Sequence, residues 1–423
     1  MHHHIASYTI GSFKRFIIRF AVIILNIIFI GFSFNNAWWV MVLVFTFPLL
    51  VIGIYDRYQK KWTLTRNYHL THGGDLVWEI GSGYFGCRKK DGSFDELQFT
   101  ENATRETVKM VGIKFSQSAK PRHGGLLPAE KVTDEIVRFR EVSAHQDCLS
   151  PRGHSTFSTP IELLEFAARL RELSGAKPVG IKLCVGHTHE ILAIVKAMLK
   201  TSIHLDYIVV YGGEGGTGTA PVEFSDFVGM PLADGLITVR NALAGTGLRD
   251  KVRLGASAKV YSAIGMARNI ALGADWSNAA RAFVFSIGCI QAQRCHTGNC
   301  PTGITTQDLG RQCDLVDDVQ VERVARFHKQ TLAALSSIVA STGLAHPSEL
   351  QPFHLIQRTG ATEAKMICRV YDFLPENSLL DSPKDTYFSE WWQAVSTDSF
   401  IPQINLASMR DQTGHAKLQD NIT

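Results

Sequence analysis

Short apolar runs bounded by polar or glycine residues recur along the middle of the chain, and amphipathic segments of helical length separate them. Runs of this length that are rich in Val, Ile and Leu are typical of buried β-strands. They lie at 111–115, 179–184, 205–210 and 252–255, with a weaker candidate at 274–277 that leads into the apolar segment 282–285. These runs are the predicted strands of the protein.

Segments with helical periodicity follow most of these runs. They cover 160–173, 188–200, 262–272 and 319–341, and Pro160 suits the first turn of the first segment. Strands that alternate with helices pair in parallel. The pattern therefore predicts an α/β fold with a parallel sheet, whose active site lies at the carboxyl ends of the strands in barrels and open sheets alike.

A long apolar region precedes this pattern, with no charged side chain from Phe20 to Tyr55. The turn-like Ser33–Asn36 divides it into two segments, each near the length that spans a bilayer. Lys and Arg flank the region but not the turn, so the positive-inside rule places both ends in the cytoplasm. We predict a transmembrane hairpin in the inner (cytoplasmic) membrane, with the catalytic part facing the cytoplasm. A cleaved signal peptide and a buried helical hairpin are the alternatives.

These patterns divide the chain into five parts. They are an N-terminal tail (1–15), the hairpin (16–55), a short linker (56–72), a barrel-like domain (73–346) and a C-terminal extension (347–423). The 423 residues are 45% hydrophobic and 19% charged, which is typical of a globular protein and not of a disordered or fibrous one. The net charge of +4 is too small to indicate nucleic-acid binding.

Three cysteines form a candidate metal site. Cys289, Cys295 and Cys300 have the spacing C-x5-C-x4-C, and Pro301 follows directly. Thiolates select zinc, copper(I) or iron–sulfur clusters. Three ligands with no obvious fourth suit a three-iron cluster better than a tetrahedral zinc site. Three reduced thiols without a metal are the alternative, which the tight clustering disfavours, and a zinc-binding membrane protein is a weaker hypothesis.

A glycine-rich loop follows the run at 205–210. It extends from Tyr211 to Pro221 and contains Gly215, Gly216 and Thr217. Glycines let a backbone approach a ligand closely and present N–H donors to an anion or a flavin ring. The loop matches neither the dinucleotide-binding fingerprint nor a P-loop, because Pro221 ends it and no Gly-Lys-Ser/Thr does. A flexible surface turn is the alternative.

A basic cluster lies at the end of the run at 111–115. It contains Lys114, Gln117, Lys120 and Arg122. Cations and an amide at a strand end suit a dicarboxylate or the negative charge of a reduced flavin. A solvated basic loop is the alternative. Lys182, in contrast, stands within an otherwise apolar run, so its side chain is expected to point at a partner or a cavity.

Together, these motifs resemble the FMN-binding glutamate synthase family, in its stand-alone, membrane-associated bacterial form. The matching runs are 114–121 with Gly124-Gly125, 213–221 and 288–303, in the same order as in the family. The resemblance implies a (β/α)8 TIM-type barrel, with FMN at the carboxyl ends of the strands beside a [3Fe-4S] cluster. It also implies reduction of 2-iminoglutarate, formed from 2-oxoglutarate and ammonia, to L-glutamate.

The resemblance also implies a role for each matching residue. Cys289, Cys295 and Cys300 would bind the cluster, while Gln117 and Lys120 would be the catalytic residues facing the substrate. The residues expected at FMN are Lys114, Lys182, Gly215, Gly216, Thr217, Gly255, Ser257, Lys259 and Arg281, the last four beside its phosphate.

The chain departs from the family before Gly73. In the family a long stretch with the first two barrel strands precedes this point, whereas only Asp56–His72 joins the hairpin to Gly73 here. We therefore predict an incomplete barrel of about six of the eight strands, with exposed strand edges. The alternative function is a truncated remnant or electron-transfer subunit that binds no flavin and retains only the cluster motif.

The expected partners follow from this chemistry. The residues after Met1 do not supply an N-terminal cysteine nucleophile, so we expect no glutaminase module ahead of the barrel. Nitrogen then comes from free ammonia or from another subunit. The remaining partners are 2-oxoglutarate or glutamate, an electron donor that the sequence does not identify, membrane lipid and, as an open alternative, a protein that completes the barrel.

Overall fold

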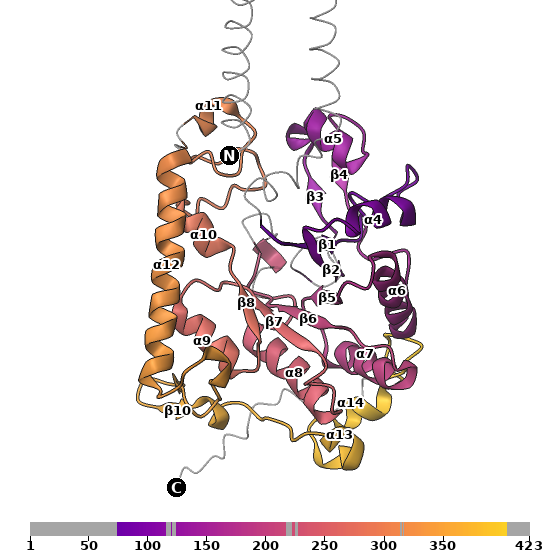
Figure 1. The fold of residues 1–423 in the computed structure, drawn as a ribbon, viewed down its shortest axis with the longest axis vertical. Helices are drawn as coiled ribbons and strands as arrows, with labels where there is room; N and C mark the ends of the chain where they lie inside the picture. Colours follow the sequence, from indigo (N-terminus) through magenta and orange to yellow (C-terminus); the bar gives the residue numbers. More distant parts are fainter. Residues whose placement is uncertain are drawn as a thin grey trace, which may run out of the picture.

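The computed structural model describes residues 74–115, 120, 124–216, 222–224, 227–313, 315 and 317–403. At its centre lies a six-stranded sheet in the order β1-β2-β5-β6-β7-β8, and every pairing in it is parallel (Figure 1). The strands are β1 (Leu76–Ile80), β2 (Val108–Lys114), β5 (Val179–Leu183), β6 (Tyr207–Tyr211), β7 (Arg253–Ser257) and β8 (Trp276–Asn278). The predicted parallel α/β sheet of about six strands is confirmed.

Helices that follow the strands cover one face of this sheet. They are α4 (Glu96–Ala103), α6 (Pro160–Leu173), α7 (Thr188–Thr201), α8 (Leu232–Gly245) and α9 (Ala263–Ala271). Helices α6, α7, α9 and α12 (Asp317–Ser341) confirm the predicted helices to within two residues at each end. Neither α4 nor α8 is predicted from the sequence. Nearly all residues of α8 are buried, so no polar face marks its period.

Smaller elements complete the described part of the chain. They are β3 (Leu126–Leu127) paired antiparallel with β4 (Cys148–Leu149), α5 (Asp134–Arg140), α10 (Arg281–Ser286), α11 (Leu309–Gln312), β9 (Ile356–Arg358) paired antiparallel with β10 (Ala364–Met366), α13 (Ser378–Asp381) and α14 (Ser389–Ala394). The segment 282–285 belongs to the short helix α10.

The main hydrophobic core lies between the sheet and its helices. Val111 and Ile113 of β2 and Ile181 of β5 point into it and are fully buried. Side chains alternate across a strand, so the residues between them point to the opposite face. That inner face carries charged and aromatic residues, including Lys182 and Tyr207. The chemistry-bearing side chains therefore face the interior side of the curved sheet.

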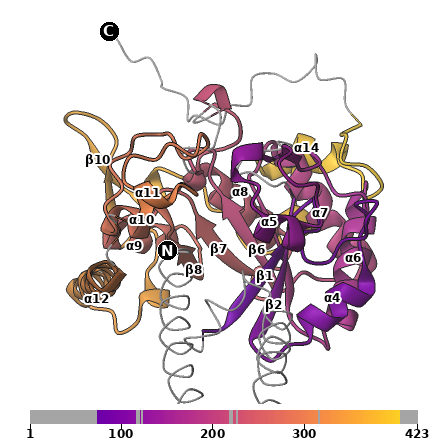
Figure 2. The ribbon, with the colours of Figure 1, turned by 90° about the horizontal axis from the view of Figure 1, so that it is seen from above.

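The sheet remains open within the part of the chain that the structure describes. There, β1 pairs with β2 alone and β8 with β7 alone. Figure 2 shows α4 on the β1 side and α12 on the β8 side of this opening. Val77, on the inner face of β1, is 53% exposed, as expected for an edge strand without a second neighbour. The structure thus agrees with the predicted incomplete barrel.

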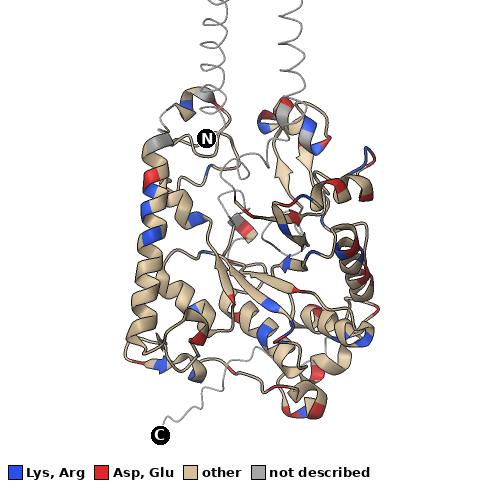
Figure 3. Cartoon of the chain, viewed as in Figure 1, with Lys and Arg blue, Asp and Glu red and all other residues tan. Residues whose placement is uncertain are grey.

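Helix α12 anchors the segment that contains the three cysteines. Its C-terminal half buries Leu335 and Val339 and packs against α9. Its N-terminal half, where Lys and Arg gather in Figure 3, contacts α10 through the Phe327 and Phe283 rings, whose centroids are 5.4 Å apart. Since Cys289 follows α10 closely, α12 fixes where the cysteine loop begins.

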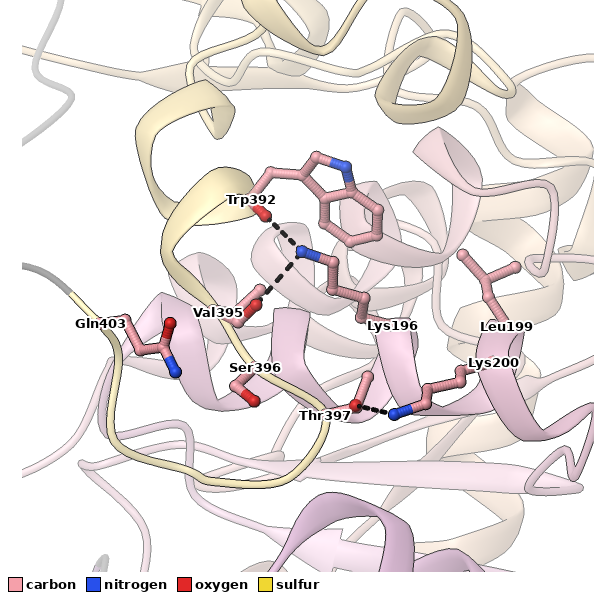
Figure 4. Close-up of a pocket in the computed structure, with 8 residues that line it drawn as sticks. All are labelled: Lys196, Leu199, Lys200, Trp392, Val395, Ser396, Thr397 and Gln403. Atoms are coloured by element: carbon pink, nitrogen blue, oxygen red, sulfur yellow. Dashed lines mark hydrogen bonds between the residues drawn. The ribbon is translucent and has the colours of Figure 1, made fainter.

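The C-terminal extension packs on α7 at the end remote from the strand tips. Lys196 Nζ donates to the carbonyl oxygens of Trp392, at 2.9 Å, and of Val395, at 3.1 Å (Figure 4). A cavity of about 580 Å³ lies beside Lys196, Lys200 and Trp392. Helix α7 starts just after the carboxyl end of β5, and the cavity lies beside its C-terminal half. The cavity is therefore far from the predicted active site at the carboxyl ends of the strands.

The predicted transmembrane hairpin at 16–55 lies outside the described residues, as do the tail at 1–15 and the linker at 56–72. Among the helices that the structure describes, none combines the length and apolar character needed to cross a membrane. The hairpin and the membrane location stay predictions.

Replacing Asn241 by leucine is expected to loosen the C-terminal extension. Asn241 of α8 is fully buried, its Nδ2 donates to the Asp372 carbonyl oxygen at 2.6 Å, and its Oδ1 accepts from the Leu374 N–H at 3.1 Å. Leucine leaves both backbone groups without these bonds, at a cost of about 3 kcal/mol. Denaturant unfolding and limited proteolysis measure the loss. Unchanged stability, equal to that of the exposed control Gln351→Leu, would contradict this role.

Candidate functional site

Charged side chains from three neighbouring strands meet at the carboxyl end of the inner face. Lys182 Nζ of β5 donates to Glu79 Oε1 of β1 at 2.6 Å and lies 5.7 Å from the centroid of the Tyr211 ring on β6. Lys114, on β2 between them, is the register partner of Lys182. These four residues, Glu79, Lys114, Lys182 and Tyr211, form the strand-tip cluster.

The strand-tip cluster favours an anionic ligand. Burial and the charge of Lys182 lower the pKa of Lys114, whereas Glu79 raises it. With all three groups ionised, two ammonium groups face one carboxylate, which leaves a positive surplus within the cluster. A positive surplus in a partly buried site attracts a carboxylate or the negative charge of a reduced flavin.

Both lysines of this cluster are predicted from the sequence, but Glu79 is not. The available signal was a charged residue between Trp78 and Ile80, in a run whose other residues are apolar. Such a residue, like Lys182, points at a partner. Its position on the first strand of the sheet could not be derived from the sequence alone.

His154 holds the end of β2, where Lys114 lies. Burial lowers the pKa of His154 to about 4, so the ring is neutral and its Nε2–H donates to the Lys114 carbonyl oxygen at 2.8 Å. The ring stacks on Phe157, at 4.9 Å between centroids, and meets the edge of Tyr84. These contacts fix the backbone immediately before the predicted catalytic residue Gln117.

Two aromatic rings cover the inner face below the cluster, and glycines make room for them. The Tyr207 hydroxyl donates to the Val111 carbonyl oxygen at 2.8 Å, and its ring lies where a Cβ on Gly180 would come within 2.5 Å of it. Trp276 lies over Gly255 in the same way, at 2.6 Å. The interior is therefore a packed floor below the site and not an open channel.

The structure places the predicted phosphate-flanking residues on different surfaces. Gly255 lies under the Trp276 indole. Ser257 ends β7, and its carbonyl oxygen accepts from the Gly212 N–H at 2.9 Å. Lys259 follows in an exposed position with a φ of 35°. Of the three residues only Lys259 is exposed, and their role at a phosphate stays a prediction.

Internal hydrogen bonds hold the described part of the glycine-rich loop. The Gly213 N–H donates to the Met230 carbonyl oxygen at 2.7 Å, and the Gly216 N–H to the Tyr211 hydroxyl at 2.8 Å. The Gly215 N–H donates to Gly212 at 2.8 Å. In this structure these three N–H groups therefore bond within the protein, and the contact of Gly215 and Gly216 with FMN stays a prediction.

Two cations and one carboxylate fix the position of this loop. Lys120, which is almost fully buried, donates to the carbonyl oxygens of Gly213 and Gly215, and Arg281 donates to that of Gly216. Both Glu214 carboxylate oxygens accept from the Leu232 N–H at 3.0 Å, at the N-terminus of α8. The structure thus brings Lys120 and Arg281 together at the glycine-rich loop, where both bond to its carbonyl oxygens.

Three other residues of the predicted site fall in undescribed stretches of the chain. Gln117, Arg122 and Thr217 lie outside the described residues. The assignment of Gln117 and Lys120 to the substrate stays a prediction.

The three cysteines occupy one loop with different surroundings. The Cys289 thiol accepts from the Gln291 N–H at 3.5 Å, while Cys300 is buried with its Sγ 3.4 Å from Thr302 Oγ1. Burial raises the pKa of Cys300, but hydrogen bonding by Thr302 and nearby backbone outweighs it and lowers the pKa to about 6. Between them, Gln291 and Gln293 adopt positive φ values of 59° and 53°, which are uncommon outside glycine.

Lys131 links this loop to the segment between β3 and β4. Its ammonium donates to the carbonyl oxygens of Cys295 and, at 3.1 Å, of Thr305. Burial lowers the pKa of Lys131, and the neighbouring thiols of Cys295 and Cys300 raise it. Two of the three cysteines therefore share one cationic neighbour.

The two implied cofactors fit the structure to different degrees. The positive strand-tip cluster has the donors that the anionic edge of a reduced flavin requires. For the iron–sulfur cluster, the thiols are suitable donors, but the described residues hold no group of three His, Cys, Asp or Glu side chains placed to bind one metal ion. The assignment of the three cysteines to an iron–sulfur cluster stays a prediction.

The fold and the site define an α/β protein with a charged site at the carboxyl ends of parallel strands. Residues 60–345 match the family model described as the conserved region in glutamate synthase. The chain belongs to the glutamate synthase family.

Individual relatives agree with this assignment. The chain is 37% identical over 291 residues to the glutamate synthase large subunit-like protein YerD of Bacillus subtilis, covering 69% of this chain and 55% of that protein. It is 33% identical over 272 residues to the archaeal glutamate synthase (NADPH) of Methanocaldococcus jannaschii, covering 64% and 50%. The chain thus spans about half the length of the curated relatives it matches.

Among solved structures, a mutant flavocytochrome b2 with pyruvate bound has a TM-score of 0.38 at 13% identity, covering 72% of this chain and 58% of that one. This likeness is too low to add to the strand order as support for the fold.

Proposed function

We propose that the chain is an FMN- and iron–sulfur-dependent oxidoreductase of glutamate synthase type, which reduces 2-iminoglutarate to L-glutamate. The match of residues 60–345 to the family is the observation that carries the proposal. The positive strand-tip cluster supports it, because both the substrate and a reduced flavin are anions. The hairpin at 16–55 would tether this enzyme to the inner membrane, with its catalytic part in the cytoplasm.

Lys114 and Lys182 are the residues that would hold the flavin ring in this function. Their ammonium groups attract a negative charge, and Glu79 keeps the Lys182 ammonium at the strand tips through the 2.6 Å ion pair. Tyr207 and Trp276 exclude water from the floor below. FMN, when bound, supplies the hydride that reduces the imine carbon, while the imine nitrogen gains a proton.

Cofactor binding tests this function directly. The full-length chain, solubilised in detergent and reconstituted anaerobically with FMN, iron and sulfide, is expected to retain about one FMN per chain. With a reduced viologen dye as electron donor, it should form glutamate from 2-oxoglutarate and ammonium. Absorbance spectra and amino-acid analysis measure both. A chain that retains no flavin would contradict the proposal.

A lysine pair supplies the matched control. Lys182→Met removes a cation from the strand tips and is expected to weaken FMN binding at least about tenfold. Lys200→Met removes a cation that is bonded to Thr397 on the far side of α7, and it should leave binding unchanged. Equal FMN affinity in both variants would place the flavin elsewhere.

The open sheet favours a second candidate, a cluster-binding remnant or electron-transfer subunit without flavin. In the described residues, β1 and β8 each leave one strand edge unpaired. On this alternative, the reconstituted chain shows an iron–sulfur spectrum without FMN absorbance. FMN in stoichiometric amount excludes it.

A further inference from the structure

Glu79 forms an ion pair with Lys182 across an intervening strand. It belongs to the edge strand β1, whereas Lys182 lies two strands away on β5, and β2 runs between them. The residue opposite Glu79 on β2 is Gly112, and a Cβ placed there would lie 3.6 Å from the Glu79 Cγ and 2.9 Å from the Tyr207 hydroxyl. Gly112 therefore makes room for the Tyr207 hydroxyl, and the Glu79 side chain passes over Gly112 at van der Waals distance on its way to the Lys182 ammonium.

The Glu79–Lys182 ion pair belongs to the strand-tip cluster on the inner face of the sheet, whereas the helices cover the other face. The side chain of Lys182 is 16% exposed and that of Glu79 35%, so water screens their attraction only in part. Both residues of the pair act on Lys114, the other cation of the strand-tip cluster: Lys182 lowers its pKa and Glu79 raises it. Removing the carboxylate would therefore leave two lysines side by side with no counter-charge from β1.

We propose that Glu79 is a positioning residue for the flavin-binding site: its carboxylate, passing over Gly112, holds Lys182 in place and limits the positive charge at the strand tips. This inference rests on the proposed function in its reference to the flavin. Glu79 acts through Lys182 and touches neither the substrate nor the hydride. Its charge sets how strongly the site prefers the anionic ring of reduced FMN over the neutral ring of oxidised FMN.

The first test needs no flavin. In the full-length chain without added cofactor, acetylation of Lys182 and Lys114 by a limiting amine reagent is followed by mass spectrometry. Glu79→Gln is expected to speed modification of Lys182 about tenfold, because the Lys182 nitrogen is no longer held in the 2.6 Å ion pair and is free to meet the reagent. The matched control is Glu96→Gln, which breaks a 2.6 Å ion pair with Arg169 on the outer face. Equal rates in wild type and Glu79→Gln would overturn the pairing.

The second test uses the flavin-loaded chain. Glu79→Gln removes a negative charge beside the ring, so the affinity for reduced FMN should rise at least about tenfold relative to oxidised FMN, seen as a more positive midpoint potential. Glu79→Asp keeps the charge and should restore a value close to wild type. An unchanged potential in Glu79→Gln would overturn the charge-setting role.

The two tests separate failure of this inference from failure of the proposed function. If wild type retains no FMN but Lys182 responds to Glu79→Gln, the enzymatic proposal fails, as does the flavin part of the inference, while the pairing stands. If FMN binds and neither lysine reactivity nor potential responds, the inference about Glu79 is wrong and the proposed function stands.

Discussion

Gly180→Ala is expected to destabilise the sheet by about 3 kcal/mol, near the upper range for overpacking a core. A Cβ at Gly180 would come within 2.5 Å of the Tyr207 ring and closer still to the Tyr207 backbone oxygen. The ring cannot simply turn away, because its hydroxyl is bonded to Val111. The backbone oxygen cannot move without breaking the pairing of β5 with β6. The change therefore acts on the scaffold of the site.

Chemical denaturation of the full-length chain in detergent measures this effect. Gly153→Ala is the matched control, because a Cβ there meets nothing within 4 Å and no positive φ is recorded at that position. A Gly180→Ala variant as stable as Gly153→Ala would show that Tyr207 does not lie against β5 as described.

Cys295→Ser is expected to abolish the iron–sulfur spectrum completely. A three-iron cluster with three protein thiolates has no spare ligand, and a serine oxygen is a poor substitute for a soft thiolate. Anaerobic reconstitution followed by absorbance and electron paramagnetic resonance measures the loss. FMN should be retained, because the strand-tip cluster lies on other elements.

A cysteine outside the motif supplies the control for this experiment. Cys313 is exposed, and its thiol donates to the Gly310 carbonyl oxygen at 2.8 Å, so Cys313→Ser should leave the spectrum intact. A cluster spectrum that survives Cys295→Ser would exclude this cysteine as a ligand. Zinc without iron or sulfide in wild type would favour a zinc site instead.

Elements with a clear periodicity were predictable from the sequence, and buried or long-range features were not. Amphipathic helices such as α6 were placed accurately because one face is polar. Helix α8, buried on nearly all sides, gave no such signal. Lys182 was identified because charge within an apolar run is costly, and Lys114 because it belongs to a basic cluster at a strand end. The pairing of Lys182 with Glu79 depends on the sheet order, which could not be derived from the sequence.

The glycine-rich loop shows what composition alone leaves out. Its glycines suggested N–H donors for a ligand, and in this structure the Gly213 and Gly216 donors bond to Met230 and Tyr211. Lys120, predicted at the substrate, is buried against the same loop. The bond from Lys120 to Gly213 joins residues 93 positions apart, and no local pattern encodes it.

The two free margins of the sheet also matter for handling the protein. A row of unsatisfied backbone donors and acceptors is a template onto which any other extended polypeptide can add. This sheet presents such a row at β1 and another at β8 within its described part. Where these margins are accessible, self-association would grow with protein concentration, and dilution should preserve monodisperse material better than extra detergent.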